Sequence, residues 1–125
     1  MTSLRYVLRK FLRFSKEFLN SKAKLTPEQY EALLVLKAYS TDKGLSVGQL
    51  SERLQVKHHT AVSLTHKLAA RKLVTKRRRR LDRRTVYVKL TGAGSKLVAP
   101  LAAVHRREIG TRAAEMIEVL KKLKE

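Results

Sequence analysis

The sequence predicts a mainly α-helical chain with one small antiparallel β-hairpin. Apolar residues recur at helical spacing along most of the 125 residues, whereas two runs rich in β-branched residues, 73–75 and 85–91, flank a very basic stretch. This length and an apolar content of 43% suit a single domain with a modest core. A chain of this size gains stability by sharing apolar surface with a second copy, so we also expect an oligomer.

Residues 4–19 form the first expected helix. The apolar positions of its stripe are Leu4, Leu8, Phe11, Leu12, Phe18 and Leu19, with Ser15 as a small interruption. Cationic residues lie mostly on the remaining surface. A basic amphipathic helix of this kind can lie on a membrane, but such a stripe more often packs against other helices. We therefore expect helix packing and no membrane partner.

Three further helices are expected before the hairpin. Thr-Pro-Glu-Gln predicts the start of a helix over residues 26–39, with Pro27 at the first helical position, where its missing N–H costs nothing. Ser-Val-Gly-Gln repeats this capping-box pattern at the start of a short helix over residues 46–54. After a compact break, apolar spacing predicts a helix over about 59–72.

The hairpin carries residues 76–84, in which seven of nine residues are Lys or Arg and one is an acid. So much like charge cannot be buried, and its repulsion is tolerable only if solvent or a polyanion neutralises it. Strands on both sides argue against a disordered tail. The whole chain agrees, because 29 Lys and Arg against 10 Asp and Glu leave a net charge of +19. Nucleic acid is the predicted partner, and a plain solvated surface is the alternative.

The tract from residue 92 onward has a helical pattern, and residues 91–94 form the turn that leads into it. Pro100 should bend the first helix of this tract or begin its regular part, and Gly110 should separate it from a second helix. We expect these helices to pack with the N-terminal helix, both within one chain and across the two-fold axis of a homodimer.

Two short helices joined by a tight turn and followed by a basic hairpin form a winged helix-turn-helix arrangement. The second of these helices is then the recognition helix. Its exposed side combines cations, short hydrogen-bonding groups and one methyl-bearing residue, a chemistry that suits base edges in a major groove. The residues expected to read or flank bases are Lys57, His58, His59, Thr60, Ser63, His66 and Lys67.

Several segments, in their order and spacing, resemble the multiple-antibiotic-resistance regulator (MarR) family of bacterial winged-helix transcription factors. They are Leu-Thr-Pro-Glu-Gln at 25–29, Leu-Ser-Glu-Arg-Leu at 50–54, residues 64–74, Asp-Arg-Arg at 82–84 and Leu-Thr-Gly-Ala-Gly at 90–94. The resemblance implies that chain 1–125 is a single MarR-like unit that dimerises. Residues 1–24 and 92–125 would supply dimerisation helices, and residues 25–91 would form the winged helix-turn-helix DNA-binding region.

The resemblance also implies roles within the wing. Asp82 would hold Arg84 through an ion pair, and Arg83 or Arg84 would enter a narrow, A·T-rich minor groove. The residues expected to meet phosphates are Arg77, Arg78, Arg79 and Arg80. This run is unusual for a wing of the family, and it should strengthen backbone binding and loosen sequence discrimination. Lys72 replaces the glycine that is common near the end of the recognition helix, so we expect that helix to end without a left-handed residue.

These features together predict a sequence-specific, double-stranded DNA-binding transcriptional regulator, a repressor that binds a pseudo-palindromic operator as a homodimer. Two alternatives stay open: a low-specificity architectural or nucleoid DNA-binding protein, and an RNA-associated basic module. Competition between duplex and single-stranded nucleic acid distinguishes the RNA-associated module from the two DNA-binding proteins. A recognition helix suits the major groove of B-form DNA rather than that of A-form RNA. We expect a cytoplasmic, nucleoid-associated protein, since no apolar stretch reaches the roughly 20 residues of a spanning helix.

Other kinds of site find little support in the sequence. It has no nucleophile elbow, paired catalytic carboxylates or zinc-protease motif, so we expect no enzyme, and without cysteine it has no disulfide or thiolate site. His59 and His66 could share a helix face, but no carboxylate or thiol accompanies the four histidines, and we expect no metal. No cofactor is expected apart from a small aromatic effector, which the family resemblance suggests. Its candidate residues, which are more simply explained as core, are Phe11, Phe14, Tyr30 and Tyr39.

Overall fold

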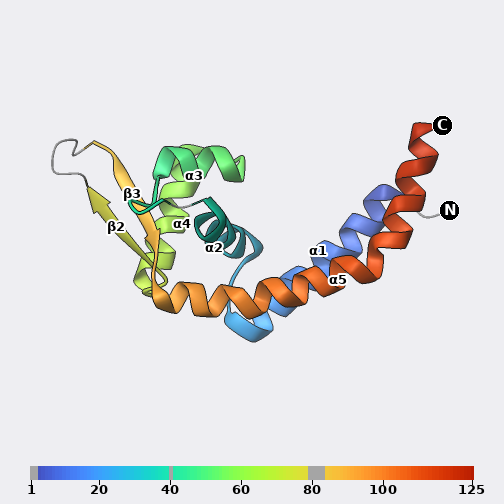
Figure 1. The fold of residues 1–125 in the computed structure, drawn as a ribbon, viewed down its shortest axis with the longest axis horizontal. Coiled ribbons are helices and arrows are strands. Elements are labelled where there is room, and N and C mark those ends of the chain that lie inside the picture. Colours follow the sequence, from blue (N-terminus) through green and yellow to red (C-terminus); the bar gives the residue numbers. More distant parts are fainter. Residues whose placement is uncertain (1–2, 40, 79–83) are drawn as a thin grey trace. The chain divides into compact units, whose positions relative to one another are not determined.

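A computed structural model of the chain describes residues 3–39, 41–78 and 84–125 (Figure 1). Its helices and strands follow in the order α1 (Leu4–Ala23), α2 (Pro27–Tyr39), β1 (Leu45–Ser46), α3 (Val47–Leu54), α4 (His58–Ala70), β2 (Val74–Arg78), β3 (Val86–Leu90) and α5 (Gly92–Lys124). The predicted class, mainly α with a small antiparallel wing, is confirmed. The chain divides into two compact units: a helical unit, Met1–Pro27 with Pro100–Glu125, and a winged unit, Glu28–Ala99.

The winged unit contains a three-stranded antiparallel sheet in the order β1-β3-β2. β2 and β3 form the predicted hairpin, whereas β1 was not predicted, because two residues are too few to show the alternation of a strand. β1 pairs Leu45 with Val88 of β3. Just before it, Gly44 has a φ of 83°, and any Cβ there would overlap the carbonyl group of Val88. Glycine is therefore what lets this loop lie against the sheet.

The predicted starts of α2 and α3 are confirmed. α2 begins at Pro27. α3 begins with a complete capping box, in which the N–H of Gln49 donates to Ser46 Oγ and the N–H of Ser46 donates to Gln49 Oε1, each over 3.0 Å. The core of this unit is built from buried side chains of α2, α3, α4, β3 and the first turns of α5. Its largest fully buried apolar side chains are Leu33, Leu36, Leu50, Leu68, Val88 and Val98.

The end of α4 differs from expectation. Lys72 has a φ of 60° and so adopts the left-handed conformation that the sequence was expected to lack there. Its N–H donates to the carbonyl of Ala69, and the N–H of Leu73 donates to the carbonyl of Leu68. This pair of bonds is a Schellman closure. It forms around a lysine because the chain must reverse at once for Leu73 and Val74 to enter the core.

The turn predicted at residues 91–94 is confirmed. Thr91 Oγ1 accepts a hydrogen bond of 3.0 Å from the N–H of Gly94 and donates one of 2.8 Å to the carbonyl of Lys72. The turn therefore joins the beginning of α5 to the end of α4. A Cβ on Gly94 would overlap the carbonyl group of Leu73, so this glycine permits a close approach of two backbone segments.

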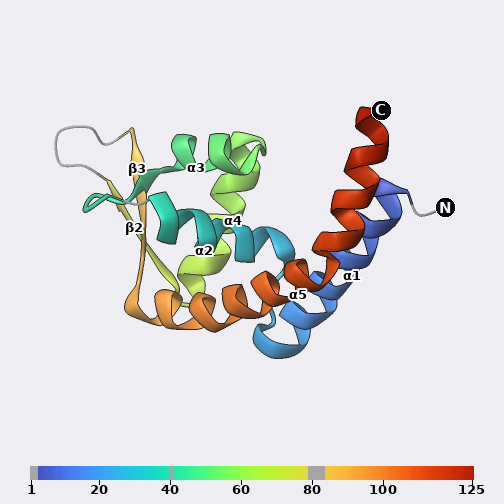
Figure 2. The same ribbon diagram turned by 45° about the vertical axis from the view of Figure 1, so that its right-hand side comes forward.

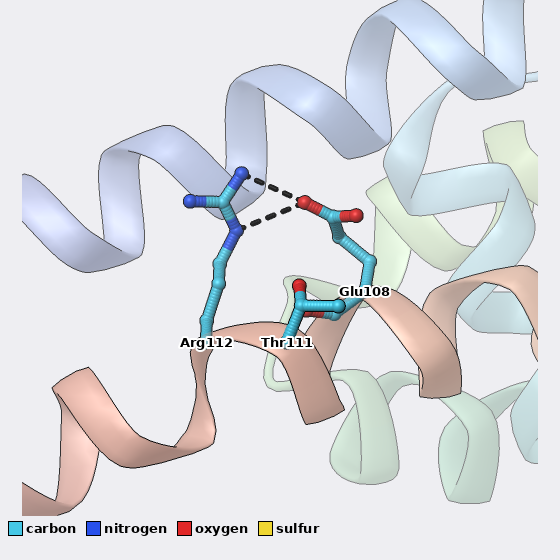
Figure 3. Close-up of polar contacts among 3 residues, drawn as sticks. All are labelled: Glu108, Thr111 and Arg112. Atoms are coloured by element: carbon cyan, nitrogen blue, oxygen red, sulfur yellow. Dashed lines mark hydrogen bonds and ion pairs between the residues drawn. The ribbon is translucent and has the colours of Figure 1, made fainter.

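In the helical unit, α1 and the C-terminal part of α5 lie side by side (Figure 2). Pro100 lies inside α5, as expected, and does not begin its regular part. The expected break at Gly110 was wrong, because α5 is one 33-residue helix that continues through this glycine. Arg112 bridges this glycine by pairing with Glu108, at 2.8 Å between Nη2 and Oε1 (Figure 3). Thr111 Oγ1 also donates to the carbonyl of Glu108. An exposed glycine costs a helix only about 1 kcal/mol, part of which the ion pair offsets.

The stripe of α1 is only partly buried. Val7, Ser15 and Leu19 are buried, whereas the side chains of Leu8 and Leu12 are 40% and 57% exposed. The latter two lie four residues apart and so share one side of the helix. Ser15, seven residues after Leu8, lies on the same side and contacts α5, so the predicted stripe extends beyond the surface that the rest of the chain covers.

Candidate nucleic-acid interface

The core determines which side of α4 faces solvent. Ala61, Leu64 and Leu68 recur at helical spacing and are buried, and buried Thr65 donates its hydroxyl to the carbonyl of Ala61 over 2.8 Å. The opposite side therefore projects outward. The predicted base-reading residues that are exposed on α4 or at its N-cap are Lys57, His58, His59, Ser63, His66 and Lys67, while Thr60 is half-buried.

The wing places alternate side chains on its two faces. β2 and β3 pair from Val74 opposite Leu90 to Arg78 opposite Val86, and paired residues share a face of the sheet. Lys76 is opposite buried Val88, and its Nζ lies 2.6 Å from Nδ1 of His66 on α4. This pairing identifies the face of the sheet that looks toward α4.

The contact between Lys76 and His66 fixes a hydrogen-bonding role. An ammonium group can only donate, so Nδ1 of His66 accepts, and the proton of the neutral imidazole resides on Nε2. His66 therefore offers an N–H donor at Nε2 rather than an acceptor. Such a donor complements the N7 or O6 acceptors of a purine in a major groove.

A groove of about 340 Å³ lies between α4 and the wing. Its lining residues are Val47, Val62, Thr65, His66, Lys76, Arg77, Arg78, Arg84 and Val86. Four of these carry a permanent positive charge and none carries a negative one. The groove thus sets a cationic wall from the wing beside α4, the predicted recognition helix.

The groove gathers only some of the residues predicted for this interface. It brings together His66, Arg77, Arg78 and Arg84. The remaining predicted residues of α4 and its cap, named above, lie outside the groove lining. Four predicted wing residues lie outside the described part of the chain: Arg79, Arg80, Asp82 and Arg83. Sequence analysis did not place Lys76 in the site. The alternation of side chains along a strand could have done so, because Lys76 lies two residues after the apolar Val74 and therefore on the same face of the sheet.

A profile of the MarR family matches residues 23–85, half of the chain. The chain belongs to the MarR family. A search of curated protein sequences found no match. The matched residues include all of α2, α3, α4 and β2, so the family assignment rests on the helices and the strand described above.

Solved structures share the fold of this MarR-family chain. The crystal structure of the S. aureus MepR–DNA complex has a TM-score of 0.82 and 23% identity, over 99% of this chain and 93% of that chain. BldR from Sulfolobus solfataricus has a TM-score of 0.74 and 21% identity, over 96% and 88%. BpsR from Bordetella bronchiseptica has a TM-score of 0.68 and 22% identity, over 98% of each chain. The DNA binding of BpsR is regulated by 6-hydroxynicotinic acid.

The helical unit of this MarR-family chain holds a second polar feature. Ser15 Oγ and His105 Nε2 are 2.8 Å apart and both residues are buried. His105 Nδ1 lies 2.8 Å from the carbonyl of Leu101, which can only accept, so Nδ1 carries the proton and Nε2 accepts from Ser15. The rings of three phenylalanines lie around this histidine: Phe11, Phe14 and Phe18. Sequence analysis had treated Ser15 only as an interruption of the stripe.

The four aromatic residues predicted for an effector site occupy different surroundings. Phe11 and Phe14 belong to the cluster around His105 in the helical unit. Tyr30 is buried in α2, and Tyr39 is exposed with the guanidinium of Arg53 3.9 Å from its ring centre. Within the described ranges, no three His, Cys, Asp or Glu side chains converge as metal ligands would. No described helix has the length and apolar character needed to cross a membrane.

Proposed function

We propose that this chain is a sequence-specific, duplex DNA-binding transcriptional regulator that acts as a homodimer in the cytoplasm. The observation that carries the proposal is the groove between α4 and the wing, where four permanent cations stand beside the exposed side of a recognition helix. Membership of the MarR family and the similarity of the fold to that of a DNA-bound protein, S. aureus MepR, support it. Its simplest regulatory action is repression, by occupying a pseudo-palindromic operator.

The geometry suggests a division of labour in DNA binding. A B-form major groove is wide enough to admit a helix, and α4 would present Ser63 and the Nε2–H of His66 to base edges there. The wing would then meet the neighbouring phosphates through Lys76, Arg77 and Arg78, and Arg84 would reach the minor groove. Phosphate contacts would position the protein, and α4 would supply the sequence preference.

The homodimer is supported by apolar surface that one chain leaves uncovered. The exposed large apolar side chains of the helical unit are Tyr6, Leu8, Leu12, Ile109, Ile117, Leu120 and Leu123. Monomeric proteins rarely leave so much apolar surface on one part of the fold. A second copy related by a two-fold axis would cover the same side chains on both chains and would present two copies of α4 to two half-sites.

Binding of a small aromatic effector is part of the proposal. Its support is the group of aromatic rings in the helical unit, and the structural similarity to BpsR, a protein regulated by 6-hydroxynicotinic acid. Aromatic carboxylic acids are the compounds to screen by thermal shift and by their effect on DNA affinity. If no compound altered either quantity, the effector would be removed from the proposal while the DNA-binding function stood.

The first test of the proposed function is duplex affinity, measured by fluorescence anisotropy at about 150 mM salt. The fragment upstream of the protein's own gene is compared with a scrambled fragment of equal length. We expect a preference of roughly a thousandfold or more. Near-equal affinities for these fragments and other candidate operators, with a steep salt dependence, would replace the regulator with a low-specificity architectural protein.

That architectural function is the second candidate, and the wing is the observation that favours it. Lys76, Arg77 and Arg78 are all exposed along β2, and such side chains bind phosphates without regard to sequence. The RNA-associated alternative is tested by adding RNA as a competitor in the same experiment. A protein that reads DNA through α4 should not be displaced by RNA, because α4 would not fit the deep, narrow major groove of an A-form helix. Effective competition by RNA would therefore favour the RNA-associated function.

A further inference from the structure

The face of the wing sheet that points away from α4 forms a second basic groove. Thr75 is paired with Lys89, and Arg77 with Tyr87, so these four side chains alternate with the α4-facing ones. The groove has a volume of about 450 Å³. Its lining residues are Asp42, Lys43, Thr75, Arg77, Arg78, Tyr87 and Lys89. We call it the outer groove.

The outer groove has the chemistry of a phosphate site. It holds four permanent cations and one carboxylate, together with the hydroxyl groups of a threonine and a tyrosine. Lys43 and Lys89 are both exposed. The one carboxylate, on Asp42, leaves a local excess of three positive charges over these seven residues. Charge of this density on a β-strand surface matches the repeated anions of a nucleic-acid backbone.

The side of this groove opposite the strands is held in place by backbone contacts. Lys89 Nζ donates to the main-chain carbonyl of Asp42 over 3.1 Å. The N–H of Gly44 donates to the carbonyl of Thr41 over 2.9 Å, and Gly44 itself lies against the backbone of Val88. The loop that carries Lys43 is thereby fixed to β3, and little conformational entropy is lost when its backbone meets a ligand.

Arg77 and Arg78 line both the outer groove and the groove that faces α4. The positive surface is therefore continuous around the wing. A minor groove about 6 Å wide has one sugar-phosphate backbone on each side. Because successive side chains of a strand point to opposite faces, a sheet placed over such a groove directs cationic side chains toward both backbones.

We propose that the outer groove binds phosphates of the second DNA strand, across the minor groove, while the α4-facing groove binds those of the first strand. The wing would then hold both backbones of one duplex. This inference rests on the proposed function, because it requires the wing to lie at a minor groove. It adds Lys43 and Lys89 to the DNA-binding residues and makes the loop before β1 part of the interface.

The test compares two variants that lose the same charge. K43Q/K89Q removes two cations of the outer groove, and K121Q/K122Q removes two exposed cations of the helical unit. The affinity of each for one short duplex is measured by anisotropy at nanomolar protein across a range of salt concentrations. For K43Q/K89Q, the slope of log affinity against log salt should fall in magnitude by about 1.8 per bound protomer. The loss should be equal for operator and scrambled DNA, and K121Q/K122Q should retain the wild-type slope.

Lys43→Gln alone is the second variant, because its ammonium is not the one bonded to Asp42. It should lower the slope by about 0.9 per bound protomer with unchanged thermal unfolding. Wild-type slopes for both outer-groove variants would overturn the inference. The inference would also be overturned if K43Q/K89Q bound one duplex with wild-type affinity but lost the ability to bind a second duplex. The outer groove would then bind a separate DNA molecule rather than the second strand of the same duplex. If the wild-type protein bound no duplex, the proposed function itself would fail.

Discussion

The two units differ in how much apolar surface they leave uncovered. Among the described residues, seven of the eight exposed large apolar side chains belong to the helical unit. The eighth, Tyr39 of the winged unit, has the guanidinium of Arg53 over its ring. The winged unit instead exposes cations, which line two grooves on opposite faces of one small sheet. Exposed apolar side chains are therefore concentrated in the helical unit, whereas the cation-lined grooves belong to the winged unit.

This difference teaches how one short chain can serve two kinds of partner. Association through apolar surface responds weakly to salt, whereas association through cations and phosphates responds steeply. The helical unit is not neutral, however: residues 3–24 contain seven Lys or Arg and one Glu. Bringing two such units together opposes like charges, so salt should weaken DNA binding and mildly strengthen dimerisation.

The largest expected effect is this opposite response to salt. Raising salt from about 50 to 200 mM should lower duplex affinity roughly a thousandfold or more if the dimer meets at least six phosphates. Over the same range the dimer dissociation constant, measured by analytical ultracentrifugation, should fall by less than about tenfold, because screening reduces a repulsion between charges. A dimer that dissociated as steeply as the DNA complex would show that both contacts are ionic.

The next effect targets the apolar surface. Leu120→Glu should raise the dimer dissociation constant at least about a hundredfold, since a two-fold axis places the carboxylate in the apolar contact twice. Leu120 is half exposed in one chain, so the helical circular-dichroism signal should remain. Lys121→Glu places an acid one residue along α5 at an exposed position and is the control. Equal dimer affinities for the two variants would remove Leu120 from the interface.

A smaller effect concerns the α4-facing groove. Arg84→Ala should weaken specific DNA binding by about 10- to 100-fold, or 1–3 kcal/mol, through the loss of one cation at the minor groove. Its dimerisation should match the wild type. Arg107→Ala, which removes an exposed cation from α5, should change DNA affinity little. If the two variants bound DNA equally well, net charge rather than position would govern the interaction.

The smallest effect separates folding stability from DNA binding. Ser15→Ala removes the donor to Nε2 of buried His105 and should lower the free energy of unfolding by about 1–3 kcal/mol. Ser21→Ala, at an exposed position of α1, is the matched control. Both variants should bind DNA as the wild type does when folded. Identical denaturant midpoints would mean that the buried serine hydroxyl contributes nothing to stability.

Local signals in the sequence were sufficient for much of the fold. The capping box of Ser46 and Gln49 and the start of α2 at Pro27 involve residues within one turn of helix. The hairpin and its charge follow from contiguous residues. For the same reason Arg77 and Arg78 of β2 were predicted as binding residues, and the structure places both in the α4-facing groove.

Features that depend on distant partners were missed. Ser15 and His105 are separated by 90 positions, and neither position in the sequence indicates the other. β1 exists because its two residues pair with β3, and Lys76 joins the site because His66 lies beside it. Gly110 shows the converse, since a residue that often interrupts helices lies inside one where neighbouring side chains bond across it. Tertiary contacts determined the first three outcomes, and contacts between side chains of one helix accompany the last.

Among the residues that the structure describes, three non-glycine residues have a positive φ, and each follows a helix: Lys24 after α1, Gln55 after α3 and Lys72 after α4. Each forces an L-amino acid into a left-handed conformation that costs roughly 1 kcal/mol and that glycine adopts freely. The free energy of unfolding could therefore be raised by substitutions at these three helix ends. Glycine at these positions offers a route to a sturdier protein with the same topology, and two of the three changes would also lower its positive charge.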